Sequence, residues 1–421
     1  MPDDARPALD SVNSFDFQIL QDPHPYFTRL REEAPVYRDP NSGFVSVATY
    51  ELVTQVCAQP KLFSNGFGEV LRSGSKKQID PEELAALKRV RPVANTLLTA
   101  DPPDHTRYRK LAMKGFSMKR VEAMTAYVET VVHELIDGIE DKGGVEFKSA
   151  FANHVPMIVI ADALGVPRED MDTFRLWSDA FITQMNGLAT KEARIEAAGR
   201  IADYQDYFIA KIAEKRANPT EDVISDLVHA DLAEEGDTRK MTEAELLSIF
   251  QQLLVAGNET TAHTLTAAMF YMISNPGLEQ LLRDRPEKVP NFIDETLRYL
   301  SPTNNMYRVA TQDAEIGGVA VKKGELILLR YGSANRDEGH FANGQTFDVD
   351  RANAKDHLAF GAGVHRCIGA QLALKEMATA WPILLKRLKG FRFAEGKNSF
   401  MYLPTILMRG VFELHVTFEK A

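Results

Sequence analysis

The chain has 421 residues, of which 44% are hydrophobic, so it can bury a sizeable core in two or three domains or in one large α fold. Its formal net charge of −10 argues against nucleic acid or an anionic membrane as the main partner. Its two cysteines cannot build a disulfide framework, which indicates a reducing compartment.

The first residues of the chain have neither the basic region nor the apolar region of a secretory signal or of an N-terminal membrane anchor. We therefore expect a cytoplasmic protein. We expect residues 1–22 to form a loose N-terminal arm.

The next part of the chain alternates helical and extended patterns up to a long loop. Residues 63–98 lose regular periodicity, and loops this long in compact proteins are usually functional or mobile. Cys57 lies in a helical pattern, where a small buried side chain is expected. The predicted elements are helices over 25–33, 49–58 and 80–90 and strands over 36–37 and 44–47.

Helices dominate the middle of the chain. Pro and Asp residues at 102–104 are typical of a first helical turn, and His105 and Arg109 are four residues apart, so both lie on one face. Thr242 and Glu245 form a capping box at the start of the longest helix, and polar residues within that helix argue against a membrane span. The predicted helices cover 119–141, 153–164, 168–185, 191–217, 242–273 and 290–299.

An acid and a hydroxyl stand side by side in the long helix, in the run Ala256-Gly257-Asn258-Glu259-Thr260. Thr can bond the carbonyl four residues earlier and bend a helix, and glycine weakens the helix locally. A bent, opened turn would leave a groove for a small ligand and waters. The alternative is a capping or interhelix polar contact.

The cysteine loop Phe360-Gly361-Ala362-Gly363-Val364-His365-Arg366-Cys367-Ile368-Gly369 precedes an apolar helical run towards residue 388. Glycines permit positive φ, and a helix N-terminus favours a thiolate. The pattern indicates a nucleophile or a single axial metal ligand, or else a buried structural cysteine in a glycine turn. A zinc site is disfavoured, because the Cys and His residues lack paired spacing.

The run FGAGVHRCIG resembles the haem-binding signature of the cytochrome P-450 superfamily, the haem-thiolate monooxygenases. The run AGNETT resembles the oxygen-activation motif of the family, and Glu295 with Arg298 resembles its Glu-x-x-Arg motif. The resemblance extends over essentially the whole chain. It implies a mainly α fold with small β-sheets, in one cytochrome P-450 domain over residues 1–421, with a long central helix over a haem that the cysteine loop holds.

The resemblance also implies roles for individual residues. Cys367 would be the axial thiolate ligand of haem b (iron protoporphyrin IX). Thr260 would hydrogen-bond dioxygen or an adjacent water, and Glu259 would feed protons from solvent. Glu295, Arg298 and Arg351 would lock the irregular segment that carries the cysteine loop. The residues implied in haem binding are His105, Arg109, Arg308 and His365 at the propionates, with Ala256, Gly257, Phe360, Gly361 and Gly369.

Position in the family pattern also indicates a substrate and partners. The candidate substrate contacts are mostly apolar with a few amides, which suits a lipophilic small substrate of terpenoid, steroid, fatty or aromatic type. Dioxygen and two electrons from a ferredoxin, with a ferredoxin reductase and NAD(P)H, would complete the reaction. We expect a monomer with no nucleic-acid or membrane partner. The substrate candidates are Leu98, Gln252, Val255, Ala256, Asn304, Asn305 and Leu407, and the basic residues that could dock a ferredoxin are Arg107, Lys110, Lys114, Arg366 and Lys375.

Two other readings stay open. A peroxide-driven haem-thiolate peroxygenase is one, although intact Glu259 and Thr260 argue against it because peroxide brings its own protons. A non-enzymatic haem-based sensor or ligand-binding protein is the other, and no regulatory domain in this sequence supports it.

Overall fold

A computed structural model describes residues 8–68, 70, 80–185, 189–234 and 237–421. Contacts between residues divide the chain into two compact units, each built from several stretches. Unit 1 comprises Met1–Val70, His263–Cys367 and Gly390–Phe418, and unit 2 comprises Leu71–Ala262, Ile368–Lys389 and Glu419–Ala421.

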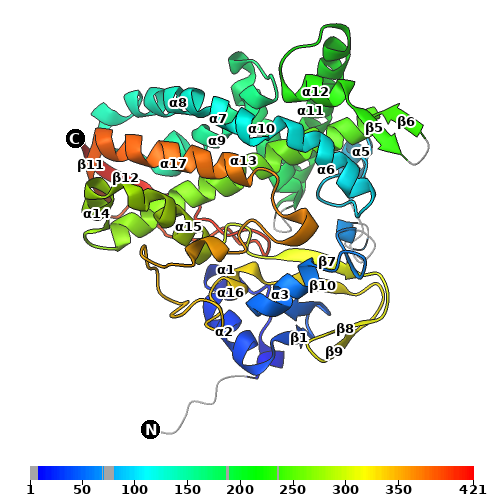
Figure 1. The fold of residues 1–421 in the computed structure, drawn as a ribbon, viewed down its shortest axis with the longest axis horizontal. Helices are drawn as coiled ribbons and strands as arrows, with labels where there is room; N and C mark the ends of the chain where they lie inside the picture. Colours follow the sequence, from blue (N-terminus) through cyan, green and yellow to red (C-terminus); the bar gives the residue numbers. More distant parts are fainter. Residues whose placement is uncertain (1–7, 69, 71–79, 186–188, 235–236) are drawn as a thin grey trace. The chain divides into compact units, whose positions relative to one another are not determined.

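Unit 1 is organised around a five-stranded sheet in the order β1-β2-β10-β7-β3 (Figure 1). The pairing of β10 with β2 is parallel and the others are antiparallel. Val45, Val47, Ile327 and Leu329 are fully buried and form a core with residues of the neighbouring helix α3. The strands are β1 (Val36–Arg38), β2 (Val45–Val47), β3 (Phe63–Ser64), β7 (Met306–Ala310) and β10 (Leu326–Leu329), and the helices beside them are α2 (His24–Glu33), α3 (Tyr50–Cys57) and α16 (Tyr331–Ala334).

Residues 8–22 are not a loose arm. They form η1 (Leu9–Ser11) and α1 (Phe17–Gln21). The side chain of Gln21 makes two hydrogen bonds of 2.8 Å with the backbone of Tyr402, and the hydroxyl of Tyr37 donates to Asp10 over 2.8 Å. Long-range bonds of this kind have no local sequence signal, which is why the pattern was misread. Residues 1–7 lie outside the described part of the chain.

Two further helices and a small hairpin belong to unit 1, and short 3-10 turns lead up to and into the cysteine loop. The helix predicted over 290–299 is confirmed as α15. These elements are α14 (Leu278–Asp284), η5 (Pro286–Lys288), α15 (Val289–Leu300), β8 (Ala314–Ile316), β9 (Val319–Val321), η6 (Ala354–Asp356) and η7 (Gly363–His365). Towards the C-terminus the chain forms β11 (Leu388–Phe393) and β12 (His415–Lys420).

Unit 2 is mostly helical. Its helix α17 (Ala370–Arg387) runs alongside α8 (Thr125–Asp137), and α10 (Met171–Met185) packs on α11 (Lys191–Ala217) (Figure 1). The single helix predicted over 119–141 is instead broken at Met124 into α7 (Met118–Ala123) and α8. The other elements are α5 (Pro81–Leu87), α6 (Asp104–Gly115), η2 (Glu140–Lys142), β4 (Gly144–Glu146), the π-helix η3 (Lys148–Ala152), α9 (His154–Ala163), η4 (Arg168–Asp170), α12 (Val223–His229), β5 (Asp231–Glu234) and β6 (Asp237–Lys240).

The longest helix is α13 (Glu243–Ser274), whose residues belong to unit 2 up to Ala262 and to unit 1 thereafter. The predicted capping box starts it: Thr242 N–H donates to Glu245 over 2.7 Å, and Glu245 N–H donates back to the Thr242 hydroxyl over 3.3 Å. Glu245 also accepts from the Tyr108 hydroxyl and from Arg239, and these bonds lower its pKa to about 2 against the opposing effect of burial. Among the described residues, no helix is both long enough and apolar enough to cross a membrane.

Candidate active site

The cysteine loop in unit 1 is a tight turn that exposes its thiol. Gly361 and Gly363 have φ of 66° and 68°, the left-handed region that favours glycine. The N–H of Cys367 donates to the carbonyl of Phe360 over 2.8 Å and closes the loop. The side chain of Cys367 is exposed, and α17 begins three residues later. The backbone therefore presents a single sulfur ahead of a helix N-terminus.

The cysteine loop packs against the end of α3. A Cβ added to Gly363 would lie 2.3 Å from the carbonyl oxygen of Cys57, so only glycine lets the two backbones approach this closely. Cys57 itself is buried, as predicted, and its sulfur lies 3.8 Å from the hydroxyl of Tyr331. A Cβ at Gly361 would lie 3.5 Å from that same hydroxyl. Cys57 and Tyr331 thus form a floor under the loop.

Arg308 extends from β7 into the interior of unit 1. It is 3% exposed, and its guanidinium donates to the carbonyl of Tyr307 over 2.7 Å and lies 4.0 Å from the Cys57 sulfur. Among the residues that the structure describes, no carboxylate pairs with it. A buried guanidinium without a counter-charge is costly, so an anion placed here would be stabilised. His365, in the cysteine loop, is half-buried.

Glu295 sits between two arginines in the fully buried part of unit 1. It accepts two bonds of 2.7 Å from Arg298 and two of 3.2 Å from Arg351. The N–H of Asp348 donates a further bond of 2.8 Å to it. Backbone carbonyls of the irregular segment, at residues 335, 342, 343, 344 and 346, accept from the remaining donors of Arg298 and from both terminal nitrogens of Arg351. The cluster therefore ties residues 335–351 to α15.

His105 and Arg109 share one face of α6 in unit 2. His105 is buried, and this burial, aided by the positive charge of Arg109, lowers its pKa to about 4. The imidazole is therefore neutral at pH 7 and can donate one hydrogen bond without carrying charge. Arg109 is half-buried one turn later.

The acid and hydroxyl of α13 lie on a continuous helix. The Thr260 hydroxyl donates to the carbonyl of Ala256 over 3.1 Å, which is the predicted bond to the preceding turn. Ala256 is exposed, whereas a Cβ at Gly257 would lie 3.4 Å from Ile160 on α9. A Cβ at this position would make ordinary van der Waals contact, so packing against α9 does not require glycine at residue 257.

Glu259 is half-buried, and its pKa is raised from the usual range of glutamate. Burial is the main cause, the positive charge of Lys148 opposes it, and the negative charge of Asp179 adds to it. Lys148 and Asp179 carry no sequence pattern that marks them as neighbours of Glu259. A carboxyl with a raised pKa gives up and regains a proton closer to neutral pH than an exposed one.

The carboxamide of Gln252 is fully engaged within unit 2. Its oxygen accepts from the N–H of Leu98 over 2.7 Å, and its nitrogen donates to the hydroxyls of Thr96 and Ser248, each over 2.9 Å. The same two hydroxyls bond each other over 2.9 Å. Gln252 thus fastens the segment around Leu98 to α13 instead of offering a spare amide. Thr96 and Ser248 were missed, although Ser248 and Gln252 have helical i, i+4 spacing.

The segment around α5 is also fastened to α11. Arg194 donates two bonds to the carboxylate of Glu83, over 2.8 and 3.0 Å. Gln205 pairs through its carboxamide with the backbone of Arg91, over 2.7 and 2.9 Å. The part of the 63–98 loop that lies in unit 2 is therefore held at three points, Glu83, Arg91 and the substrate candidate Leu98.

The other substrate candidates differ in exposure. Leu98 is 41% exposed and Val255 is half-buried, both in unit 2. Asn304 and Asn305 in unit 1 are buried, and their N–H groups donate to the carbonyl of Leu407, over 2.7 and 3.2 Å. The two asparagines thus connect the segment just before β7 to the segment that carries Leu407.

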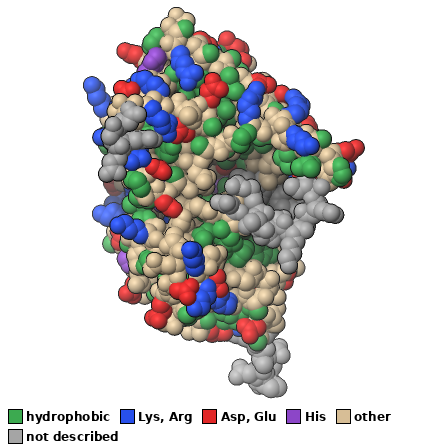
Figure 2. Space-filling view, turned by 90° about the vertical axis from the view of Figure 1, so that its right-hand side faces the viewer, with side chains coloured by type: hydrophobic (Ala, Val, Ile, Leu, Met, Phe, Trp, Pro, Cys, Tyr) green, Lys and Arg blue, Asp and Glu red, His purple; other side chains and the backbone are tan. Residues whose placement is uncertain are grey.

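The surface carries both signs of charge. Figure 2 shows Lys and Arg side chains interspersed with Asp and Glu side chains over the face that it presents. Two residues of the expected basic docking patch are already paired, Arg107 with Asp104 over 2.8 Å and Lys375 with Glu122 over 2.7 Å. The local positive field is weaker than the sequence alone indicates.

Comparison with known proteins identifies the class of enzyme. The model of the family described as Cytochrome P450 matches residues 65–398. The solved structures reported below share the fold over nearly the whole chain. The chain belongs to the cytochrome P450 family and is an oxidoreductase, a cytochrome P450 monooxygenase.

Three relatives illustrate the range. The Steroid C26-monooxygenase of Mycobacterium tuberculosis (strain CDC 1551 / Oshkosh) is 34% identical over 392 residues, which cover 93% of this chain and 99% of that protein. P450BioI, solved in complex with an acyl carrier protein ligated to hexadec-9Z-enoic acid, has a TM-score of 0.83 at 30% identity, covering 96% and 99%. CYP109E1 from Bacillus megaterium, solved with testosterone, has a TM-score of 0.79 at 28% identity, covering 94% and 99%.

Proposed function

We propose that this chain is a haem-thiolate monooxygenase that hydroxylates a lipophilic small molecule with dioxygen and two electrons, and that the Cys367 thiolate would hold the iron of haem b. The observation that carries the proposal is that unit 1 contains both an exposed thiol on a glycine loop, at Cys367, and the buried Arg308, which has no counter-charge among the described residues. Haem supplies one iron to a thiolate and two carboxylates to cationic or hydrogen-bonding groups. The donor set of the chain fits both needs.

The propionates would be held by Arg308, Arg109, His105 and His365. Two guanidiniums can each bind a carboxylate through paired N–H groups. His105 would add a hydrogen bond from its imidazole, which is a donor in either protonation state. The haem face would meet Ala256, Gly257, Phe360, Gly361 and Gly369.

When bound, haem would supply the oxygen chemistry, which ligation by the Cys367 thiolate would favour. The chain supplies protons and orientation. The Thr260 hydroxyl can donate while it accepts from a water, and Glu259 can reload that water because its raised pKa keeps a proton available nearer neutral pH. Glu295, Arg298 and Arg351 keep the cysteine loop in place by fixing residues 335–351.

The substrate class follows from the lining groups and the relatives. With the Gln252 carboxamide engaged by Leu98, Thr96 and Ser248, the remaining candidates are mostly apolar. The relatives act on a steroid or were solved with testosterone or an acyl chain. We infer a steroid-like, terpenoid, fatty or aromatic substrate, with a ferredoxin, its reductase and NAD(P)H as the electron supply.

The test is spectroscopic. The purified protein should be red, and its reduced carbon monoxide complex should show the strongly red-shifted Soret band of a thiolate-bound haem. Cys367→Ala should lose this band. Cys57→Ser is the matched control, since it changes the other cysteine, and it should keep the band. Retention of the band in Cys367→Ala would contradict the assignment, and turnover with peroxide but not with a ferredoxin system would favour the peroxygenase reading.

A further inference from the structure

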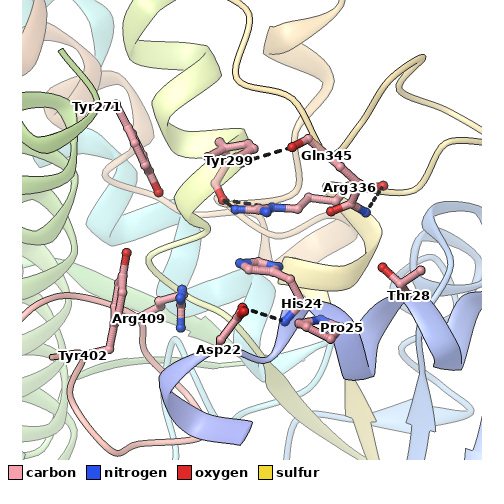
Figure 3. A pocket seen from close by; sticks show the side chains of 10 residues that line it. All are labelled: Asp22, His24, Pro25, Thr28, Tyr271, Tyr299, Arg336, Gln345, Tyr402 and Arg409. Carbon is pink, nitrogen blue, oxygen red and sulfur yellow. Dashed lines mark hydrogen bonds between the residues drawn. The ribbon is translucent and has the colours of Figure 1, made fainter. Parts of the chain in front are cut away.

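Unit 1 contains a hollow whose lining includes none of the residues assigned to haem, protons or substrate. It is a cavity of about 450 Å³. Figure 3 shows its ten lining side chains, which come from the start of α2, from α13 and α15, and from the segments at 336–345 and 402–409. Its residues are Asp22, His24, Pro25, Thr28, Tyr271, Tyr299, Arg336, Gln345, Tyr402 and Arg409.

Two buried arginines face this cavity. Arg336 is 7% exposed and Arg409 is 6% exposed. The guanidinium carbon of Arg336 lies 3.6 Å from the ring centre of Tyr299, and that of Arg409 lies 3.7 Å from the ring centre of Tyr402. Stacking of this kind holds the planar groups in fixed orientations and leaves their edges available for hydrogen bonds.

Neither arginine forms an ion pair with any described residue. Arg336 donates from Nε and one terminal nitrogen to the carbonyl of Tyr299, over 3.3 and 2.7 Å. Arg409 donates to the carbonyls of Leu20 and Gln21, over 3.4 and 3.2 Å. Nη1 of Arg336 and Nε of Arg409 have no hydrogen-bond partner in the described part of the chain, so each arginine keeps donors to spare.

The nearby carboxylates do not neutralise the two charges. The carboxylate of Asp337, next to Arg336, accepts instead from the N–H groups of Tyr50 and Gly339, over 2.8 and 3.1 Å. Asp22 lines the cavity but is exposed, and it accepts from the N–H of His24 over 3.3 Å. The cavity therefore has an excess of positive charge.

His24 adds a third unused group. Both of its ring nitrogens are buried, and neither has a hydrogen-bond partner among the described residues. Figure 3 shows its ring projecting into the space beside Arg336. Burial lowers its pKa, and the charges of Arg336, Arg409 and Arg31 lower it further. A buried polar side chain without a partner is rare in proteins and calls for an explanation.

Two tyrosine hydroxyls complete the donor set. Tyr271 and Tyr402 line the same side of the cavity, and their hydroxyl ends point toward one another in Figure 3. Within the described residues neither hydroxyl makes a hydrogen bond. The hollow thus combines spare arginine N–H groups, an imidazole and two phenols with a single exposed carboxylate.

We propose that this cavity binds an organic anion, a carboxylate or phosphate monoester carried on a flat apolar body, with Arg336 and Arg409 as the charge partners. Guanidinium forks match carboxylate and phosphate oxygens. The volume lies within the range of about 300–1,000 Å³ typical of small-molecule pockets, which is more than a bare inorganic anion needs. The tyrosine rings provide the apolar walls. An anion would also give His24 an acceptor for its N–H.

Titration calorimetry on the haem-loaded protein tests the proposal with benzoate, phenyl phosphate, inorganic phosphate and uncharged benzyl alcohol as probes. Benzoate or phenyl phosphate should bind at one equivalent without shifting the haem absorption spectrum, and which of the two binds tighter distinguishes a carboxylate from a phosphate ligand. Arg409→Gln should weaken that binding at least tenfold. The matched control Arg168→Gln removes an exposed arginine of unit 2 and should leave binding unchanged.

Four outcomes would overturn the proposal. They are equal binding by Arg409→Gln and the parent, equal binding of benzyl alcohol, binding of inorganic phosphate alone, and binding that shifts the haem spectrum. If Arg409→Gln fails to fold, His24→Gln and Tyr402→Phe replace it. Each removes one donor from the cavity and should weaken binding severalfold, and unchanged binding in both would equally refute the site.

Discussion

Unit 1 holds two buried arginine clusters that differ in whether a carboxylate neutralises the charge of the arginines. Around Glu295, Arg298 and Arg351 meet one carboxylate and a ring of backbone carbonyls. Around His24, Arg336 and Arg409 meet carbonyls and aromatic rings but no carboxylate among the described residues. The arginines of both clusters are buried, with exposed fractions between 0% and 7%, so burial alone does not separate a structural charge from a binding charge.

The two clusters differ in how many of their hydrogen-bonding groups already have partners. In the Glu295 cluster the carboxylate accepts five hydrogen bonds, and all of the N–H directions of Arg298 are used. Such a cluster has nothing left to offer a ligand, and removing one partner leaves the others buried and unpaired. Arg308, Arg336 and Arg409 have no carboxylate partner among the residues that the structure describes, so an incoming anion would neutralise their charge.

The largest expected effect comes from removing the charge of Glu295, at the centre of the Glu295 cluster. Glu295→Gln leaves two buried guanidiniums facing one neutral amide, so we expect a loss of about 3–5 kcal/mol in the free energy of unfolding. Urea unfolding of the purified protein measures it. The matched control is Glu196→Gln, at an exposed i, i+4 pair with Arg200, where we expect a change below about 1 kcal/mol. Equal losses in both variants would refute the claim that the buried carboxylate of Glu295 stabilises the fold more than an exposed ion pair does.

A buried acid with no hydrogen-bond or ion-pair partner in the described part of the chain should give a pH-dependent effect of intermediate size. Glu376 on α17 is 2% exposed, and burial raises its pKa to about 8. The folded state keeps the proton up to that pH, whereas the unfolded chain releases it above about pH 4.3. Stability should therefore fall as the pH rises towards 8, by up to about 1.4 kcal/mol per pH unit.

The variant Glu376→Gln has nearly the same shape and cannot ionise. Its urea midpoint should be nearly flat between pH 6 and pH 8 where that of the parent falls, and the variant should be the more stable of the two at pH 8. A parent protein that gains stability over this interval, or a variant with the same slope as the parent, would show that Glu376 is not buried as a neutral acid.

The smallest stability effect is expected at Arg308. Replacing an unpaired buried guanidinium by an apolar side chain should leave the haem-free protein as stable as before or slightly more stable. Arg308→Met should nevertheless weaken haem binding about tenfold, or about 1.4 kcal/mol. Haem titration with unfolding of the apoprotein separates the two effects. A large loss of apoprotein stability would instead show that Arg308 has a structural role, like the arginines around Glu295.

Much of the fold could be predicted because its helices have strong local patterns. The helix predicted over 191–217 coincides with α11, and α13 differs from its predicted range by one residue at each end. The break at Met124 and the hairpin of β5 and β6 were missed. Both depend on contacts and turn geometry that the apolar periodicity of a short segment does not record.

The candidate site was predictable to the extent that its residues lie in contiguous motifs. The cysteine loop and the run around Thr260 each carry their chemistry within ten residues. The partners that tune them do not: Lys148 beside Glu259, Thr96 beside Gln252, and Cys57 beneath Gly363 come from distant segments. His24, Arg336 and Arg409 are similarly scattered along the chain, so no sequence pattern predicted the cavity that they line.

The close approach of Gly363 to Cys57 has a consequence for biosynthesis. The two residues are roughly three hundred positions apart, and contacts of such high sequence separation form late because long loops must close first. During synthesis, the end of α3 leaves the ribosome long before the cysteine loop exists. The end of α3 at Cys57 therefore lacks its contact with Gly363 for most of translation. The thiol of Cys367 reaches its final position only after nearly the whole chain has been made. Haem capture should accordingly be one of the last events in the folding of this protein.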